Sequence, residues 1–273
     1  MTLRHRRHEP LSYLEAGNGN VPVLLVHGNF AGKLWWRELL KDPLPQTRLI
    51  APDLPGFGES PGGRAFAPTI PSYARALARF LDALGLDRAV LVGHSFGAAV
   101  ATQLALSDPG RFPGMFLISP APPNGLDTPE YLYPLLESYR YDRFGLRQAL
   151  RHTMQTRMPP YLDDLVEEAR NMHPVNFSGN ARLLSEWNVV DKLHRYRNHV
   201  LVASGNRDDL VSLSSAKATA RAFSLGAYAN LGSVGHSPQI EAPHLVRDLL
   251  SHLLTAINGR LPNSGSNSRR DDR

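Results

Sequence analysis

The chain of 273 residues has no cysteine and no apolar run that approaches the ~18 residues of a membrane-spanning helix. Without cysteine it can form neither disulfides nor thiolate metal sites, and a cysteine nucleophile is excluded. The missing apolar run argues against membrane insertion. The basic start, Met1–His8, is followed by Glu9 and Pro10 instead of the apolar stretch of a secretory signal. We therefore expect a cytoplasmic protein.

The sequence has little excess charge in its body. The formal net charge is +5, and much of the excess lies near the two ends, at Arg4, Arg6, Arg7, Arg269, Arg270 and Arg273. No basic run is interleaved with aromatic residues, and no groove-binding motif is present. The pattern indicates solvated ends, so we expect no nucleic-acid partner.

Motifs that bind nucleotides or metals are also missing. Gly17-Asn18-Gly19 and Gly56-Phe57-Gly58 do not complete a dinucleotide fingerprint, and neither G-x-x-x-x-G-K-[ST] nor H-E-x-x-H occurs. We therefore expect no metal and no cofactor.

Short apolar runs rich in β-branched residues alternate with helical patterns along most of the chain. This alternation predicts an α/β fold, with a mostly parallel sheet flanked by helices. The expected strands are 21–26, 48–51, 88–92, 114–118, 199–203 and 227–231, and the expected helices are 71–84, 98–106, 214–223 and a last one from Pro243. Ser72 is the expected N-cap of the first helix, and Gly85 its C′ residue.

The alternation stops after the strand at 114–118. Residues 120–195 open with Pro120-Ala121-Pro122-Pro123 and carry amphipathic helical stretches rich in Tyr, Leu and Arg. We predict a helical cap at 120–195, inserted into a core made of 1–119 and 196–258. The polar tail, 259–273, is expected to be disordered.

Ser95 lies in Gly93-His94-Ser95-Phe96-Gly97, which fits G-x-S-x-G. The motif follows a predicted strand directly and precedes a predicted helix. Side chains at either glycine would collide with the neighbouring strand and helix. Because glycine has no side chain, the chain can form a tight, strained turn that exposes the serine hydroxyl. This context predicts that Ser95 is a nucleophile.

A serine hydroxyl needs a base, which needs an orienting acid in turn. After such a turn the acid precedes the histidine along the chain. His236 follows the last predicted strand, and Asp208 and Asp209 follow the strand before it. We predict His236 as the base and Asp208 as the acid, with Asp209 as the alternative.

The developing oxyanion needs hydrogen-bond donors. We predict the backbone N–H of Phe96, directly after the nucleophile, and that of Asn29 in the loop after the first core strand. The N–H of Phe30 is the alternative to that of Asn29. His27 and His94 lie close in sequence to these donors, and we expect each to fix its own turn through a local hydrogen bond.

Four segments together resemble the α/β-hydrolase superfamily, in its cap-bearing branch with a serine nucleophile. They are Val26-His27-Gly28-Asn29, Ala51 to Ser60, Gly93 to Gly97, and the pair around Asp208 and His236. The resemblance spans Tyr13 to Ile257 and implies that Asp53 is a structural loop residue. His-Gly-Asn is similar to the same loop of haloalkane dehalogenases. Those enzymes use an aspartate nucleophile, so Ser95 argues against that activity.

The resemblance implies attack by Ser95 on an acyl carbonyl, a serine-bound acyl enzyme and its release by water. The leading hypothesis is hydrolysis of a small or medium carboxylic ester or lactone, with that small acyl molecule as the partner. The same residues could serve carbon–carbon cleavage of a diketone, amide or peptide hydrolysis, or perhydrolysis. A receptor that binds a small ligand and turns it over slowly is a further alternative.

Overall fold

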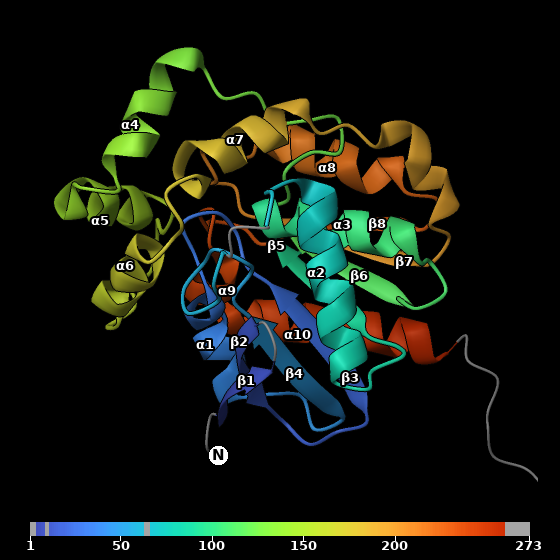
Figure 1. Cartoon of the computed structure of the whole chain (residues 1–273). Helices are drawn as coiled ribbons and strands as arrows, with labels where there is room; N and C mark the ends of the chain where they lie inside the picture. Colours follow the sequence, from blue (N-terminus) through green and yellow to red (C-terminus); the bar gives the residue numbers. More distant parts are fainter. Residues whose placement is uncertain (1–3, 9–10, 63–65, 260–273) are drawn as a thin grey trace, which may run out of the picture.

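The computed structural model describes residues 4–8, 11–62 and 66–259, and its centre is an eight-stranded sheet (Figure 1). The strand order is β1-β2-β4-β3-β5-β6-β7-β8. β2 is antiparallel to β1 and β4, and the remaining neighbours are parallel. The strands are β1 (Arg4–His8), β2 (Leu11–Ala16), β3 (Val21–Val26), β4 (Thr47–Pro52), β5 (Val90–His94), β6 (Gly114–Ile118), β7 (His199–Ser204) and β8 (Gly226–Asn230).

The mostly parallel sheet predicted from the sequence is confirmed, and its central strands are apolar because both faces are buried. Along β3, Leu24 and Val26 face one core while Val23 and Leu25 face the other. This alternation follows from the two-residue period of a strand. Strands β1 and β2 were not predicted from the sequence. Of the expected tail, 260–273 lies outside the described residues.

Helices cover both faces of the sheet. In Figure 1, α2 and α3 lie in front of the sheet and α10 lies behind it. α8 contributes to the same core as α2 and α3, while α1 and α10 pack together on the opposite core. The bounds are η1 (Lys33–Trp36), α1 (Arg37–Lys41), α2 (Ile70–Ala83), α3 (Phe96–Ser107), α8 (Leu213–Ala222), α9 (Pro238–Glu241) and α10 (Pro243–Asn258).

The start of α2 differs from the sequence prediction, and its end agrees with it. The N-cap is Thr69, whose hydroxyl accepts the Ser72 N–H at 3.1 Å. Ser72, expected as the N-cap, is N3, and its hydroxyl accepts the Thr69 N–H at 2.8 Å to complete a capping box. The expected C′ role of Gly85 is confirmed: its φ is +67°, and its N–H donates to Asp82 O at 2.9 Å.

Between β6 and β7 the chain forms only helices. They are η2 (Glu130–Leu132), α4 (Tyr133–Ser138), α5 (Arg143–His152), α6 (Leu162–Arg170), α7 (Asn176–Glu186) and η3 (Val190–Arg195). We call residues 119–198 the helical insertion. Its helices α5 and α6 form a small core of their own, which continues into the main domain through Trp35 and Ile240. Within the described ranges, no helix is both long and apolar enough to cross a bilayer.

Candidate active site

The turn at Ser95 connects β5 to α3, and its backbone is strained. Ser95 has φ +53° and ψ −117°, a conformation that residues with a side chain rarely adopt. A Cβ at Gly93 would lie 2.7 Å from Ala98 Cα, and one at Gly97 would collide with the carbonyl oxygens of Val26 and His27. The two glycines therefore let β5, α3 and the end of β3 approach closely, as the motif predicts.

Replacing Gly97 with alanine is expected to destabilise the fold, because the new Cβ would meet fixed backbone. We expect the free energy of unfolding to fall by about 1–3 kcal/mol or more, measured by urea titration. Gly179→Ala is the matched control. Gly179 lies in α7, where the nearest atom to an added Cβ is Val175 Cγ2 at 4.0 Å. That change should stabilise the helix by about 0.5–1 kcal/mol. Equal effects at the two positions would contradict the steric argument.

The loop after β3 lies directly against the Ser95 turn. A Cβ at Gly28 would lie 3.3 Å from Ser95 Cβ and 3.0 Å from His94 Nδ1. Asn29 and Phe30, the two candidate donors of the second oxyanion hydrogen bond, follow Gly28 in this loop. Phe96 is the first residue of α3, so its N–H has no intrahelical acceptor. The predicted donors therefore lie on the two segments that adjoin Ser95.

His27 stabilises this loop, as the sequence analysis expected. Its Nε2 accepts the Leu54 N–H at 2.9 Å, and its Nδ1–H donates to Gly28 O at 2.9 Å. Burial lowers the pKa of His27 to about 4, although Asp53 opposes the shift. A neutral ring with both nitrogens engaged is suited to holding the turn.

His236 and Asp208 form a buried pair. His236 Nδ1 lies 3.0 Å from each oxygen of the Asp208 carboxylate. Asp208 Oδ1 also accepts the backbone N–H groups of Leu210 and Val211 at 3.0 and 2.9 Å. Burial raises the pKa of Asp208, but the hydrogen bonds from His236 and Val211 outweigh burial and hold the pKa below its ordinary value. Asp208 is therefore a carboxylate at neutral pH.

Asp209 lies apart from this pair. Its side chain is 63% exposed, and its Oδ2 lies 3.6 Å from His152 Nε2. The Asp208 side chain is instead buried, and it is held by His236 and by the backbone N–H groups of Leu210 and Val211. Of the two candidate acids, only Asp208 contacts His236.

His94 connects the Ser95 turn to the segment that carries His236. Its Nε2–H donates to His236 O at 2.7 Å, and the two ring centroids lie 5.0 Å apart. Burial lowers the pKa of His94 to about 3, helped by the nearby His236. Among the described residues, no hydrogen bond joins the Ser95 hydroxyl to His236.

The helical insertion rests on the loops that bear these residues. Asn180 of α7 donates its Nδ2–H to Asn29 Oδ1 at 3.0 Å. Thr153 and Ser237 join their hydroxyls at 3.0 Å. The insertion thereby contacts the loop after β3 and the loop after β8, which lie on either side of Ser95.

Glu168 of α6 is a further contact between insertion and core, and it is buried. Its carboxylate accepts the Leu34 N–H at 3.1 and 3.3 Å and lies against Gly32. Nearby, Lys33 Nζ forms an ion pair with Asp53 at 2.5 Å and with Glu59 at 3.4 Å. Burial raises the pKa of Glu168 well above its ordinary value, and the Asp53 carboxylate raises it further.

This raised pKa makes the folded state hold a proton that the unfolded state releases. Stability from Glu168 is therefore present below pH about 4.5 and is lost as pH rises through the folded-state pKa. We expect Glu168→Gln, which stays neutral, to lose less unfolding free energy than wild type between pH 5 and pH 8 in urea titrations. The exposed Glu186→Gln should follow wild type. Parallel profiles for Glu168→Gln and wild type would be evidence against this assignment.

Aromatic side chains line one side of the loop after β3. Phe30 packs edge-to-face against Tyr139 and Phe177, with centroid distances of 5.7 and 5.8 Å. The insertion contributes both partners. Two other tyrosines of the insertion, Tyr131 and Tyr141, are 78% and 77% exposed and lie at its surface. Tyr139, by contrast, packs against Phe30 of the candidate oxyanion loop.

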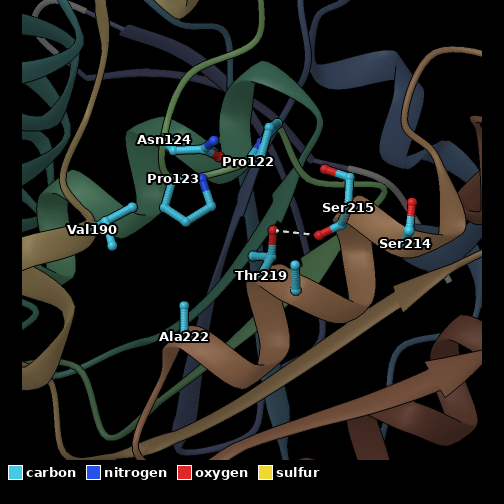
Figure 2. Close-up of a pocket in the computed structure, with 9 residues that line it drawn as sticks. Pro122, Pro123, Asn124, Val190, Ser214, Ser215, Thr219 and Ala222 are labelled. Atoms are coloured by element: carbon cyan, nitrogen blue, oxygen red, sulfur yellow. Dashed lines mark hydrogen bonds between the residues drawn. The ribbon is translucent and has the colours of Figure 1, made fainter.

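A separate pocket of about 590 Å³ lies between the segment after β6 and α8 (Figure 2). Its wall begins at Pro122, one residue after Ala121, whose N–H donates to Ser95 O at 3.3 Å. In Figure 2, Thr219 donates to Ser215 O, 3.0 Å away, at the α8 side of this pocket. None of the predicted site residues is among the residues that line it.

Sequence reasoning missed three polar residues that support the site: Glu168, Asn180 and Glu241. Glu241 accepts a hydrogen bond from the N–H of Gly235, the residue before His236, at 3.0 Å. The sequence places Glu241 shortly after His236, but a surface carboxylate at the start of a helix has the same local pattern. The sequence therefore does not identify Glu241 as a buried hydrogen-bond acceptor. The partners of Glu168 and Asn180 lie 134 and 151 residues away, beyond the reach of any local signal.

Comparison with known proteins assigns most of the chain to one family. A family model described as the alpha/beta hydrolase fold matches residues 21–243. A 2-hydroxy-6-oxo-2,4-heptadienoate hydrolase of Pseudomonas putida is 41% identical over 100 residues, which cover 36% of this chain and 36% of that protein. The matching segments span less than half the length of the curated relatives.

Two solved structures are similar over most of their length. A thermophilic esterase from Thermogutta terrifontis has a TM-score of 0.79 and 23% identity, covering 94% of this chain and 98% of that one. A meta-cleavage product hydrolase from Pseudomonas fluorescens has a TM-score of 0.74 and 23% identity, covering 90% and 94%. At these identities the likeness establishes the fold.

Proposed function

Because the chain belongs to the α/β-hydrolase fold family, we propose that it is a serine hydrolase with Ser95 as nucleophile, His236 as base and Asp208 as orienting acid. The observation that carries this proposal is the buried His236–Asp208 pair, with Nδ1 3.0 Å from both carboxylate oxygens. His236 of this pair lies on a loop hydrogen-bonded to His94, the residue before the strained Ser95. We further propose that the helical insertion, predicted at 120–195, is the cap of this site.

The pair determines which nitrogen of His236 acts as base. With its Nδ1–H donated to Asp208, the neutral imidazole presents an unprotonated Nε2. Nε2 takes the Ser95 proton as Oγ attacks the acyl carbonyl. The oxyanion is held by the N–H groups of Phe96 and Asn29, with Phe30 as the alternative to Asn29. Asp208 stabilises the imidazolium without taking its proton.

The intermediate then collapses in the usual order of acyl transfer. The imidazolium of His236 gives its proton to the leaving alcohol, and the acyl group stays on Ser95 Oγ. A water, deprotonated by His236, attacks the acyl enzyme and forms a second tetrahedral intermediate. When this breaks down, the carboxylic acid leaves and the proton returns to Ser95.

We propose a small or medium carboxylic ester or lactone as the substrate. The supporting feature is the aromatic side chains of Phe30, Tyr139 and Phe177 beside the candidate oxyanion loop. An apolar acyl group can pack there while its carbonyl oxygen meets the amides. This site needs no charged group on the substrate.

A second candidate is carbon–carbon cleavage of a diketone by the same residues. It is favoured by the similarity to the Pseudomonas putida 2-hydroxy-6-oxo-2,4-heptadienoate hydrolase. A panel of p-nitrophenyl acetate and butyrate, a lactone, a thioester and a 2-hydroxy-6-oxodienoate separates the two. We expect the esters and lactone to be turned over fastest. Preference for the dienoate would favour the second candidate.

A fluorophosphonate tests the nucleophile itself. We expect it to label Ser95, identified by peptide mass spectrometry, and to abolish turnover. Labelling with negligible turnover across the panel would favour a slow-turnover receptor. No labelling of Ser95 would refute the proposal.

A further inference from the structure

The backbone is anchored on both sides of His236. On one side, His94 Nε2–H donates to His236 O at 2.7 Å. On the other side, the Gly235 N–H donates to Glu241 Oε1 at 3.0 Å. Because these two bonds bracket the Cα of His236, they fix the direction in which its side chain leaves the chain. We call residues 235–241 the histidine loop.

Glu241 connects the histidine loop to the helical insertion. It is the last residue of α9 and is 7% exposed. Its second oxygen, Oε2, accepts both the N–H and the hydroxyl of Thr156, each at 2.8 Å. One carboxylate therefore receives three donors from two segments that are far apart in sequence. Carboxylates held by several N–H and O–H donors form short, strong hydrogen bonds.

The residues around Thr156 add further contacts to the same loop. Thr153 and Ser237 join their hydroxyls at 3.0 Å, and Arg157 Nη1 donates to Ile240 O at 2.9 Å. A Cβ at Gly235 would lie 2.8 Å from both Gln155 Cγ and Glu241 Oε1. Residues 153–157, which we call the strap, therefore lie along the histidine loop and pack closely against it at Gly235.

We propose that Glu241 is a positioning residue for His236, and that through it the strap of the helical insertion sets the placement of the catalytic base. This inference rests on the proposed function. Glu241 contacts neither ring nitrogen of His236 in the described contacts; it acts on the backbone that carries the ring. Its contribution is to hold the imidazole between Asp208 and the Ser95 hydroxyl.

Placement matters because proton transfer depends steeply on distance. A general base must come within hydrogen-bond reach of the proton it removes. A displacement of about 1 Å can cost about 100-fold in rate. Because the displacement slows the chemical step, kcat should fall while KM changes little.

The first test is Glu241→Gln in the full chain, assayed with p-nitrophenyl butyrate. Glutamine has one acceptor oxygen, so either the Gly235 N–H or the two donors of Thr156 lose their partner. We expect kcat to fall about 10- to 100-fold, with KM within threefold of wild type. The ¹H NMR signal of the His236 Nδ1–H, which lies downfield because of Asp208, should shift or broaden. A kcat within twofold of wild type, or an unmoved signal, overturns the proposal.

The second test replaces Thr156 and does not depend on the folding of Glu241→Gln. Thr156→Val removes the hydroxyl bond to Glu241, and Thr156→Ser retains it. We expect about a 3- to 10-fold lower kcat for valine and a serine variant within twofold of wild type. Equal kcat values for the two variants overturn the proposal. Glu186→Gln, on the exposed end of α7, is the control and should behave as wild type.

The two kinds of failure can be told apart. Fluorophosphonate labelling of wild-type Ser95 reports on the proposed function and does not involve Glu241. The NMR signal reports on His236 directly and needs no substrate. If wild type is neither labelled nor active, the proposed function is wrong, while a moved signal in Glu241→Gln still supports the positioning role.

Discussion

Replacing Ser95 with alanine is expected to lower kcat for p-nitrophenyl butyrate by about 10⁶-fold. The variant keeps the His236–Asp208 pair and the amides of Asn29 and Phe96, but it has no oxygen to form the acyl enzyme. The residual rate is what the oxyanion donors and binding achieve with water alone. Steady-state rates and a burst titration of the acyl enzyme measure this directly, and the burst should vanish.

Ser107→Ala is the matched control for this substitution. Ser107 is the last residue of α3, and its hydroxyl donates to Leu104 O at 2.6 Å, away from the candidate site. Its kcat should stay within about twofold of wild type. If Ser95→Ala retained more than a tenth of wild-type kcat, or fluorophosphonate labelled another residue, Ser95 would not be the nucleophile.

The Ser95 turn could be predicted because its causes are local. A strand, a turn with a glycine two residues to either side of Ser95, and a helix lie within a single short segment. The atoms that exclude side chains at Gly93 and Gly97 belong to that segment and to Val26 and His27. The parallel strands that make the sheet were predictable for a similar reason. Burial on both faces leaves a continuous apolar run, such as that of β3, which is visible in sequence.

The first two strands could not be predicted from the same signal. β1 has the sequence RHRRH, without an apolar residue, and forms through its antiparallel pairing with β2. At α2, Thr69 and Ser72 both suit an N-cap, and the reciprocal bonds between them decide which one begins the helix. In both cases the deciding interaction involves a partner that propensity alone does not identify.

The contacts between the helical insertion and the core could not be predicted from the sequence either. Thr153, Glu168 and Asn180 each contact a residue that lies at least 84 positions away in the sequence. Hydrophobic periodicity predicts that α5, α6 and α7 are helices with one buried face, but it does not say which polar group each helix brings to the core. These contacts join the part of the chain that would select substrates to the part that would carry out the reaction.

Asp208→Asn is expected to lower kcat by about 10⁴-fold, whereas Asp209→Asn should change it by less than about threefold. Asparagine at 208 can donate its amide hydrogen to His236 Nδ1, which favours the tautomer with the proton on Nε2. That nitrogen could then no longer accept the Ser95 proton, and the imidazolium would lose its counter-charge. Asp209 is exposed and faces His152, so its loss leaves His236 unchanged.

The pH dependence of Asp208→Asn provides an independent check on this result. Wild-type Asp208 stays charged because its pKa lies below the ordinary value, so its effect on His236 is constant across neutral pH. In the variant, a high hydroxide concentration should partly restore the rate. Hydroxide from solvent can remove the Ser95 proton in place of the imidazole, whose Nε2 is already protonated. If Asp209→Asn proved the more damaging change, the acid would be Asp209, and the loop after β7 would have to rearrange in the active enzyme.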